Sequence, residues 1–186
     1  APVFTSGATG TVAENAATST VIYTAATTDA DNLAARTYSL SGTDAALLII
    51  DSSTGAVTLK NSADFEAKTS YSFNVIANDG DNETEQAVVV SVTNLNDNVT
   101  TGTITLTGAA EVDETLAFVS TLSDADGFGS VSYQWLADNA AISGATGENL
   151  TINEALIGKY ISVQAAYTDG TGYCSSYQSS TKLVLP

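Results

Sequence analysis

The stretch Tyr71-Ser72-Phe73-Asn74-Val75 alternates large apolar side chains with small polar ones. Because successive side chains of a β-strand point to opposite faces, this period of two predicts a strand with one face in a core and the other in water. Short runs rich in Thr, Val and Ile surround the stretch, turn-forming residues separate them, and helix signals are scarce. We therefore expect the chain to be all-β.

The first half of the chain contains seven such runs. They are Thr11–Ala13, Thr20–Ala26, Arg36–Leu40, Leu47–Ile50, Ala56–Leu59, Tyr71–Ala77 and Gln86–Thr93. Seven short strands in about a hundred residues is the number found in an immunoglobulin-like sandwich. We expect residues 1–98 to form one such module.

The strand pattern starts again after Asn94-Leu95-Asn96-Asp97-Asn98. The second set of runs is Thr103–Thr107, Thr115–Thr121, Val131–Ala137, Asn149–Ile152, Tyr160–Tyr167 and Lys182–Leu185. The expected fold is therefore two tandem Greek-key β-sandwich modules joined end to end, the first at residues 1–98 and the second at residues 99–186.

The composition limits what the protein can do. The 186 residues include 21 acids, 5 bases, no histidine and one cysteine, and the formal net charge is −16. The chain therefore cannot form a Ser-His-Asp triad, an imidazole metal site or an internal disulfide. The negative charge argues against nucleic acid as a partner. No apolar run approaches the ~18 residues of a membrane span, so we expect no membrane insertion.

The acids fall mainly at expected turns and strand ends. Two acids that are two residues apart on extended chain point the same way, so Asp64 and Glu66 can converge on one ion, as can Asp124 and Asp126. Calcium is the cation that suits such oxygen ligands, of which it takes six to eight. Because no segment has the contiguous loop of an EF-hand, we expect a calcium site that is assembled from distant segments.

Residues 1–98 resemble a cadherin repeat. The matching segments, in the family's order, are Ala13-Glu14-Asn15 (x-E-x), Asp29-Ala30-Asp31 (D-x-D), Asp64-Phe65-Glu66 (D-R-E), Asp79-Gly80 (x-D-x-G) and Asn94-Leu95-Asn96-Asp97-Asn98 (the D-x-N-D-N calcium linker). Two positions depart from the family: Asn94 replaces the first linker Asp, and Phe65 replaces the usual Arg. The loss of one carboxylate should weaken a calcium site without abolishing it.

Residues 99–186 are similar to the Ig-like repeats of very large, type I-secreted bacterial surface adhesins. The matching segments are Tyr133–Ala137, Ile142–Thr146, Ile157–Lys159 and Tyr167–Gly170. This module has no D-R-E and no second linker motif. The second module keeps Asp124, Asp126 and Asp169. These match the acids that a cadherin repeat contributes to the calcium site shared with the preceding repeat.

Together the two resemblances imply one calcium site between the modules. Its implied ligands are Glu14, Asp64, Glu66, Leu95, Asn96, Asp97 and Asn98 from the first module and Asp124, Asp126 and Asp169 from the second. Leu95 and Asn98 would donate backbone oxygens. Asp29, Asp31 and Asp79 would serve an upstream repeat.

The implied function is that of a calcium-dependent structural extender in a bacterial adhesin. We expect a secreted, cell-surface, monomeric protein whose partners are neighbouring repeats of the same chain. The opening Ala1–Phe4 resembles the segment that follows a cadherin linker and lacks signal-peptide features, which favours an interior piece of a longer protein.

The sequence leaves two other functions open. The first is a module that binds a cell-surface glycan or protein through Tyr133, Trp135 or Tyr177; Trp135 then faces solvent, whereas in the extender it is a buried core residue. The second is a glycosidase with Asp64 and Glu66 as its acid pair. Neighbouring acids on one strand edge usually share a cation instead, so we expect no enzyme.

Overall fold

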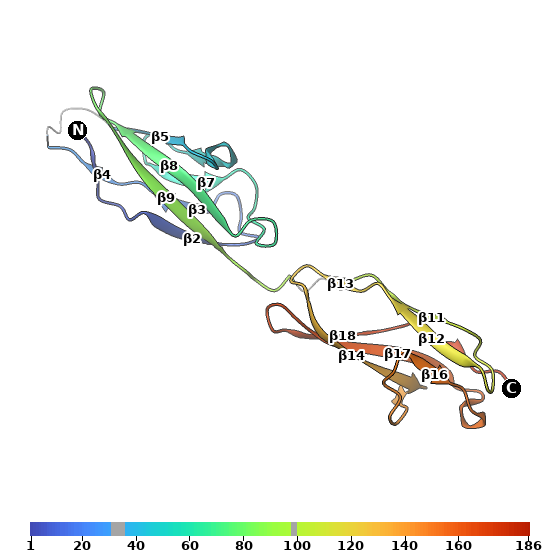
Figure 1. Ribbon diagram of the computed structural model, residues 1–186. Coiled ribbons are helices and arrows are strands. Elements are labelled where there is room, and N and C mark those ends of the chain that lie inside the picture. The colour runs from blue at the N-terminus through green and yellow to red at the C-terminus, as the bar shows by residue number, and fades with distance from the viewer. Residues whose placement is uncertain (31–35, 98–99) are drawn as a thin grey trace. The chain divides into compact units, whose positions relative to one another are not determined.

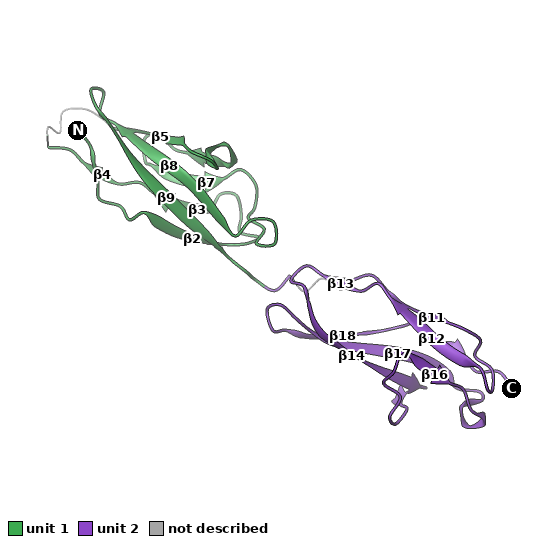
Figure 2. Ribbon diagram, in the orientation of Figure 1, with its two compact units in different colours: residues 1–95 green, residues 96–186 purple. Residues whose placement is uncertain are grey.

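The computed structural model describes residues 1–30, 36–97 and 100–186 (Figure 1). The chain forms two compact units, residues 1–95 and residues 96–186 (Figure 2). Of the acids and amides considered above, Asp31 and Asn98 lie outside the described residues, as does the expected module boundary after Asn98.

The first unit contains two main sheets. The larger has the strand order β2-β9-β8-β5, formed by Thr9–Ala13, Glu83–Thr93, Ser70–Asn78 and Thr37–Ser41. The other has the order β3-β7-β6, formed by Val21–Thr24, Ala56–Leu59 and Leu48–Ile50. A two-stranded pair joins β1 (Val3–Phe4) to β4 (Thr27–Thr28), and a 3₁₀ turn, η1 (Ala45–Leu47), precedes β6. Strand β2 runs parallel to β9, while β8 is antiparallel to both β9 and β5.

The core of the first unit lies between these two sheets. Tyr71, Phe73 and Val75 of β8 are buried, while Ser72 between them is exposed, so the alternation predicted for this stretch is confirmed. These side chains belong to one cluster with Val57 of β7 and apolar residues of β3 and β6. Burial of apolar surface by both sheets is what holds the sandwich together.

The second unit has the same layered plan. One sheet has the order β11-β12-β16, formed by Ile104–Thr107, Thr115–Ser120 and Asn149–Thr151. The other has the order β15-β14-β17-β18, formed by Ala140–Ala141, Phe128–Ala137, Tyr160–Asp169 and Cys174–Gln178, and β19 (Lys182–Leu183) also pairs with β17. The short strands β10 (Thr100–Thr101) and β13 (Ser123–Asp124) pair with each other, and a 3₁₀ turn, η2, spans Glu154–Leu156.

Trp135 lies at the centre of the second core. Its exposed fraction is 0%, and its indole nitrogen donates a hydrogen bond to the carbonyl oxygen of Gly147 at 2.9 Å. The core interpretation of Trp135 is therefore confirmed, and its interpretation as a solvent-facing sugar platform is wrong. Tyr133 and Tyr177 are half-buried and pack against the same core.

Every run that the sequence predicts as a strand is a strand in the structure, within a few residues at the ends. The prediction missed the two-residue strands β1, β4, β10, β13 and β15, which are too short to show a period. It also missed β18, whose sequence Cys-Ser-Ser-Tyr-Gln follows a Gly-rich turn and has little apolar character. Among the described residues, no helix is long and apolar enough to cross a membrane.

Candidate metal centres

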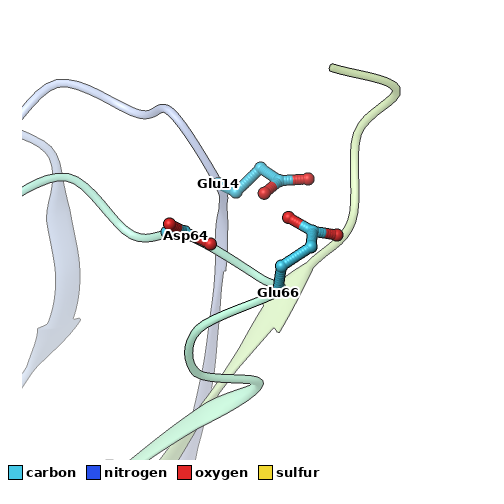
Figure 3. Close-up of side chains that lie close together, drawn as sticks. All are labelled: Glu14, Asp64 and Glu66. Carbon is cyan, nitrogen blue, oxygen red and sulfur yellow. The ribbon is translucent and has the colours of Figure 1, made fainter. Parts of the chain in front are cut away.

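Three acids of the first unit converge at one end of its sandwich. Glu14 directly follows β2, and Asp64 and Glu66 lie in the connection between β7 and β8. One carboxylate oxygen from each lies within 4.8 Å of the others. Figure 3 shows the carboxylates of Glu14 and Glu66 turned toward each other, with Asp64 beside them.

Glu14 is held in place by main-chain donors. It is 1% exposed, and its two carboxylate oxygens accept hydrogen bonds from the backbone N–H groups of Phe65, at 2.9 Å, and of Leu95. One buried side chain thus ties together the end of β2, the β7–β8 connection and the segment after β9. The Phe65 side chain packs against the core, which accounts for an apolar residue in place of the family's Arg.

The neighbouring acids are also oriented by hydrogen bonds. Asp64 accepts one from the backbone N–H of Ala67 at 2.9 Å, and Glu66 accepts one from the side-chain amide of Asn94 at 3.2 Å. The amide oxygen of Asn94 is buried and has no hydrogen-bond partner. An unsatisfied buried oxygen beside a carboxylate fits a cation ligand better than a packing residue.

The second unit has a matching cluster. Asp124 ends β13, Asp126 follows it in the turn before β14, and Asp169 ends β17. Their carboxylate oxygens also lie within 4.8 Å of one another. One oxygen of Asp126 is buried without a hydrogen-bond partner, while the hydroxyl of Tyr167 donates to Asp124 at 3.2 Å.

Asp169 is the most enclosed acid of this cluster, at 6% exposed. Burial raises its pKa, but hydrogen bonds from the Thr171 hydroxyl, the backbone N–H groups of Tyr173 and Thr171, and the Asn96 side chain outweigh burial, so the pKa lies below its ordinary value. Asp169 is therefore ionised at neutral pH, as a calcium ligand must be.

The first described residues of the second unit, Asn96 and Asp97, lie against these acids. The side-chain amide of Asn96 donates hydrogen bonds to Asp169 and to the Thr171 hydroxyl, the latter at 2.9 Å. The backbone N–H of Asp97 donates to Asp126 at 2.8 Å. Leu95, in contrast, is bound to Glu14 of the first unit through its N–H, a contact that the sequence analysis did not foresee.

The donor chemistry of both clusters fits calcium. Each brings together carboxylate oxygens and amide or hydroxyl oxygens, and each contains a buried oxygen that lacks a hydrogen bond. Lys68, the base closest in sequence to the first cluster, forms its ion pair with Asp44, at 2.9 Å. A hard divalent cation with oxygen ligands is the chemistry that such a set supports.

Two of the acids assigned to an upstream repeat also lie close together. The carboxylates of Asp29 and Asp79 are 3.6 and 3.5 Å from the α-amino nitrogen of Ala1. The ligand set predicted from the sequence lacks Thr171 and Tyr167, whose hydroxyls contact the second cluster. No motif marks a single hydroxyl residue, so only the fold reveals them.

Comparison with known proteins shows which proteins the chain is similar to. Residues 8–93 match the family model of the cadherin domain. In structure, the chain is similar to human protocadherin-24 EC1-2 (TM-score 0.64, 18% identity, covering 100% of this chain and 98% of that chain). It is also similar to mouse cadherin-23 EC22-24 (TM-score 0.66, 20% identity, covering 96% of this chain and 65% of that chain). At these identities the likeness shows the fold alone.

No curated protein matches the chain in sequence. Cadherin domains are extracellular repeats that typically bind calcium at linker sites and act in adhesion, and they are not an enzyme family. The second unit is all-β, as the sequence predicts, and an Ig-like repeat is consistent with this fold. The chain is thus a tandem all-β protein whose residues 8–93 match the family model of the cadherin domain and whose fold is similar to that of tandem cadherin repeats.

Proposed function

We propose that the chain is a calcium-dependent extender segment of a bacterial cell-surface adhesin, stiffened by calcium at the junction of its two units. The observation that supports this best is how the acid clusters relate to the linker sequence. Leu95 is bound to Glu14 in one unit, and the next residue, Asn96, is bound to Asp169 in the other. Two acidic clusters are therefore attached to consecutive residues.

The proposed mechanism is electrostatic. The chain has a net charge of −16. Each unit contains one cluster of three acids: Glu14, Asp64 and Glu66 in the first, and Asp124, Asp126 and Asp169 in the second. These carboxylates repel one another, and calcium would replace repulsion with shared coordination. Asn96, Asp97, Asn98 and the Leu95 backbone would complete the ligand set. Binding to the folded state alone would then raise stability by mass action.

The setting in an adhesin rests on the second unit. Its residues 99–186 resemble repeats of large bacterial adhesins, and the burial of Trp135 removes one of the three aromatic side chains considered for the glycan-binding alternative. A series of such modules would hold an adhesive tip away from the cell. Acidic surfaces would keep the array soluble.

A calcium titration tests the proposal. We expect the melting temperature to rise with CaCl₂ and to return to its initial value with EDTA, and we expect small-angle scattering to report a narrower range of shapes with calcium. A calcium concentration 100 times the dissociation constant would add about 2.7 kcal/mol to the free energy of unfolding. Asp97→Asn should weaken the response, whereas Asp81→Asn, at an exposed acid, should not. Absence of any thermal shift, with unchanged scattering, would refute calcium binding.

A further inference from the structure

Strand β18 forms an unpaired edge of the second unit. It is the last strand in the order β15-β14-β17-β18 and, among the described residues, it pairs with β17 alone (Figure 1). Its register with β17 runs from Cys174 to Gln178 without a shift. The other side of β18 therefore presents backbone groups that no strand uses.

The hydrogen bonds between β17 and β18 show which backbone groups of β18 are left on the free edge. The backbone N–H of Ser179 donates to Val163, and the N–H of Asp169 donates to the carbonyl oxygen of Tyr173. In an antiparallel pair, every second residue of a strand directs its N–H and C=O groups toward the partner strand. The backbone groups of Ser175 and Tyr177 therefore also face β17. The N–H and C=O groups of Cys174, Ser176 and Gln178 then point away from β17, along the free edge.

Apart from being short, this edge lacks charge, proline and a bulge, three of the features that normally prevent edge pairing. Residues 170–181 contain no charged residue and no proline, and the β17–β18 register contains no bulge. The strand is also exposed at Cys174, Ser176 and Gln178. The edge strand β5 of the first unit differs, because the backbone N–H of Tyr38 bonds to the carbonyl oxygen of Ser52 in a neighbouring loop.

The lack of charged residues extends from β18 to the neighbouring strands of the sheet. Strand β14 has no charged residue, and β17 has only Asp169, at its end. The sheet β14-β17-β18 is thus a nearly uncharged surface on a chain whose net charge is −16. Two copies of so acidic a protein repel each other wherever acids face acids, so an uncharged edge is where they can approach closely.

We propose that β18 pairs antiparallel with β18 of a second copy of this chain, with the twofold axis at Ser176. This register places Cys174 opposite Gln178 of the second copy and engages the outward groups of all three residues in ladder hydrogen bonds. It joins the two sheets into one continuous sheet. The inference is independent of the calcium sites, which lie on other segments.

So short an edge gives a weak dimer. The isolated chain is then a monomer when dilute, as the sequence analysis expected, and it associates at high concentration. Many copies anchored to one surface have a high effective concentration, at which a weak contact between neighbours becomes occupied. The edge would link adhesin molecules side by side.

Sedimentation velocity between about 10 μM and 1 mM protein, with reductant present, tests the proposal in calcium and in EDTA. We expect a concentration-dependent dimer in both conditions. Ser176→Lys, which places like charges opposite each other at the twofold, should weaken association at least about tenfold. Ser176→Pro should do the same, because it removes an outward N–H. Circular dichroism and the melting temperature confirm that each variant is folded.

Ala166→Lys is the matched control. Ala166 lies directly opposite Ser176 on β17, is exposed on the same face, and belongs to an inner strand that offers no free edge at this position. We expect this variant to associate within about threefold of the wild type. The same added charge is then harmless when it is moved off the edge.

Spin labelling gives a second measurement. Cys174 is the chain's one cysteine, and it is exposed. In the proposed register the two copies of Cys174 are separated by four residues along the strands, or about 13 Å, so paired labels should give a short, narrow distance distribution. A monomer at every concentration would overturn the proposal and leave the edge to a strand of a different protein. A dimer that Ser176→Lys leaves intact, or one with long label distances, would also overturn it.

Discussion

Glu14 shows how one residue can serve both folding and a metal site. Its carboxylate is 1% exposed, and two backbone N–H groups from distant segments compensate its charge. A buried charge is tolerated only when it is hydrogen-bonded in this way. The same carboxylate belongs to the cluster with Asp64 and Glu66, so the fold fixes its position before any cation binds.

Glu14→Gln should therefore lower both the stability of the first unit and its affinity for calcium. The glutamine amide replaces one acceptor oxygen with a donor that faces a backbone N–H, which costs about 1–3 kcal/mol. We expect a lower urea midpoint in EDTA, and in addition a smaller calcium-induced rise in melting temperature. Glu148→Gln, at an exposed position, is the control and should change neither. If Glu14→Gln matched the control in EDTA, its structural role would be disproved.

Asp44 is an acid whose role is structural. Burial raises its pKa, but the backbone N–H of Ser72, at 2.7 Å, and the Lys68 ammonium, at 2.9 Å, outweigh burial and lower the pKa below its ordinary value. A carboxyl group whose pKa is lower when folded stabilises the protein above its unfolded pKa. That contribution is lost as the pH falls through the folded pKa.

The pH dependence of stability should therefore be shallower in Asp44→Asn. We expect the variant to lose about 1–2 kcal/mol at pH 7 and less in acid, because the wild-type contribution falls as the pH drops below the unfolded pKa and through the lower folded pKa. Calorimetry in EDTA across about pH 3–7 measures the difference. Asp81→Asn should run parallel to the wild type; equal slopes for Asp44→Asn and wild type would contradict the assignment.

At the scale of the element, the turn after β17 positions the second acid cluster. The backbone N–H of Gly170 donates to the carbonyl oxygen of Asp126 at 3.1 Å. A β-carbon at residue 170 would overlap that oxygen. Only glycine lets the β17 end and the β13–β14 turn approach closely enough to place Asp169 beside Asp126.

Gly170→Ala should separate these two segments. We expect a loss of about 1–3 kcal/mol in the stability of the second unit, together with weaker calcium binding, because the acids no longer converge. Trp135 fluorescence during urea unfolding reports on this unit. Gly147→Ala adds the same methyl group where no atom lies within 4 Å, and it should be close to wild type. Similar behaviour of the two variants would show that the close approach is unimportant.

At the scale of the whole molecule, the excess of 21 acids over 5 bases has two effects. Diffuse repulsion between exposed acids is reduced by any salt, because the Debye length is about 10 Å at 0.1 M. Repulsion inside the two clusters acts over a few ångströms and needs a coordinated cation. The two effects can therefore be separated by the choice of salt.

We expect about 1 mM CaCl₂ to raise the melting temperature more than NaCl of the same ionic strength. Magnesium should be less effective than calcium, because it prefers a strict octahedral geometry and keeps its water ligands. Differential scanning fluorimetry of the same sample in the three salts makes the comparison. Equal responses to all three would mean that only general screening acts.

The sequence by itself determined the all-β class and the position of the long strands. The alternation in Tyr71–Val75 is a local property, because side-chain direction along a strand depends on neighbouring residues alone. The pairs Asp64/Glu66 and Asp124/Asp126 were also visible without a fold. Turns at residues 65–67 and 125–126, rather than the extended chain that was expected, bring the acids of each pair together.

The tertiary structure decided which distant groups meet. Asp169 joins Asp124 and Asp126, Leu95 bonds to Glu14, and Trp135 is enclosed in the core only because far-separated strands pack together. The free edge of β18 is likewise a property of strand order, which no local pattern encodes. Local periodicity fixes the direction of a side chain, whereas its neighbours depend on long-range pairing of the whole sheet.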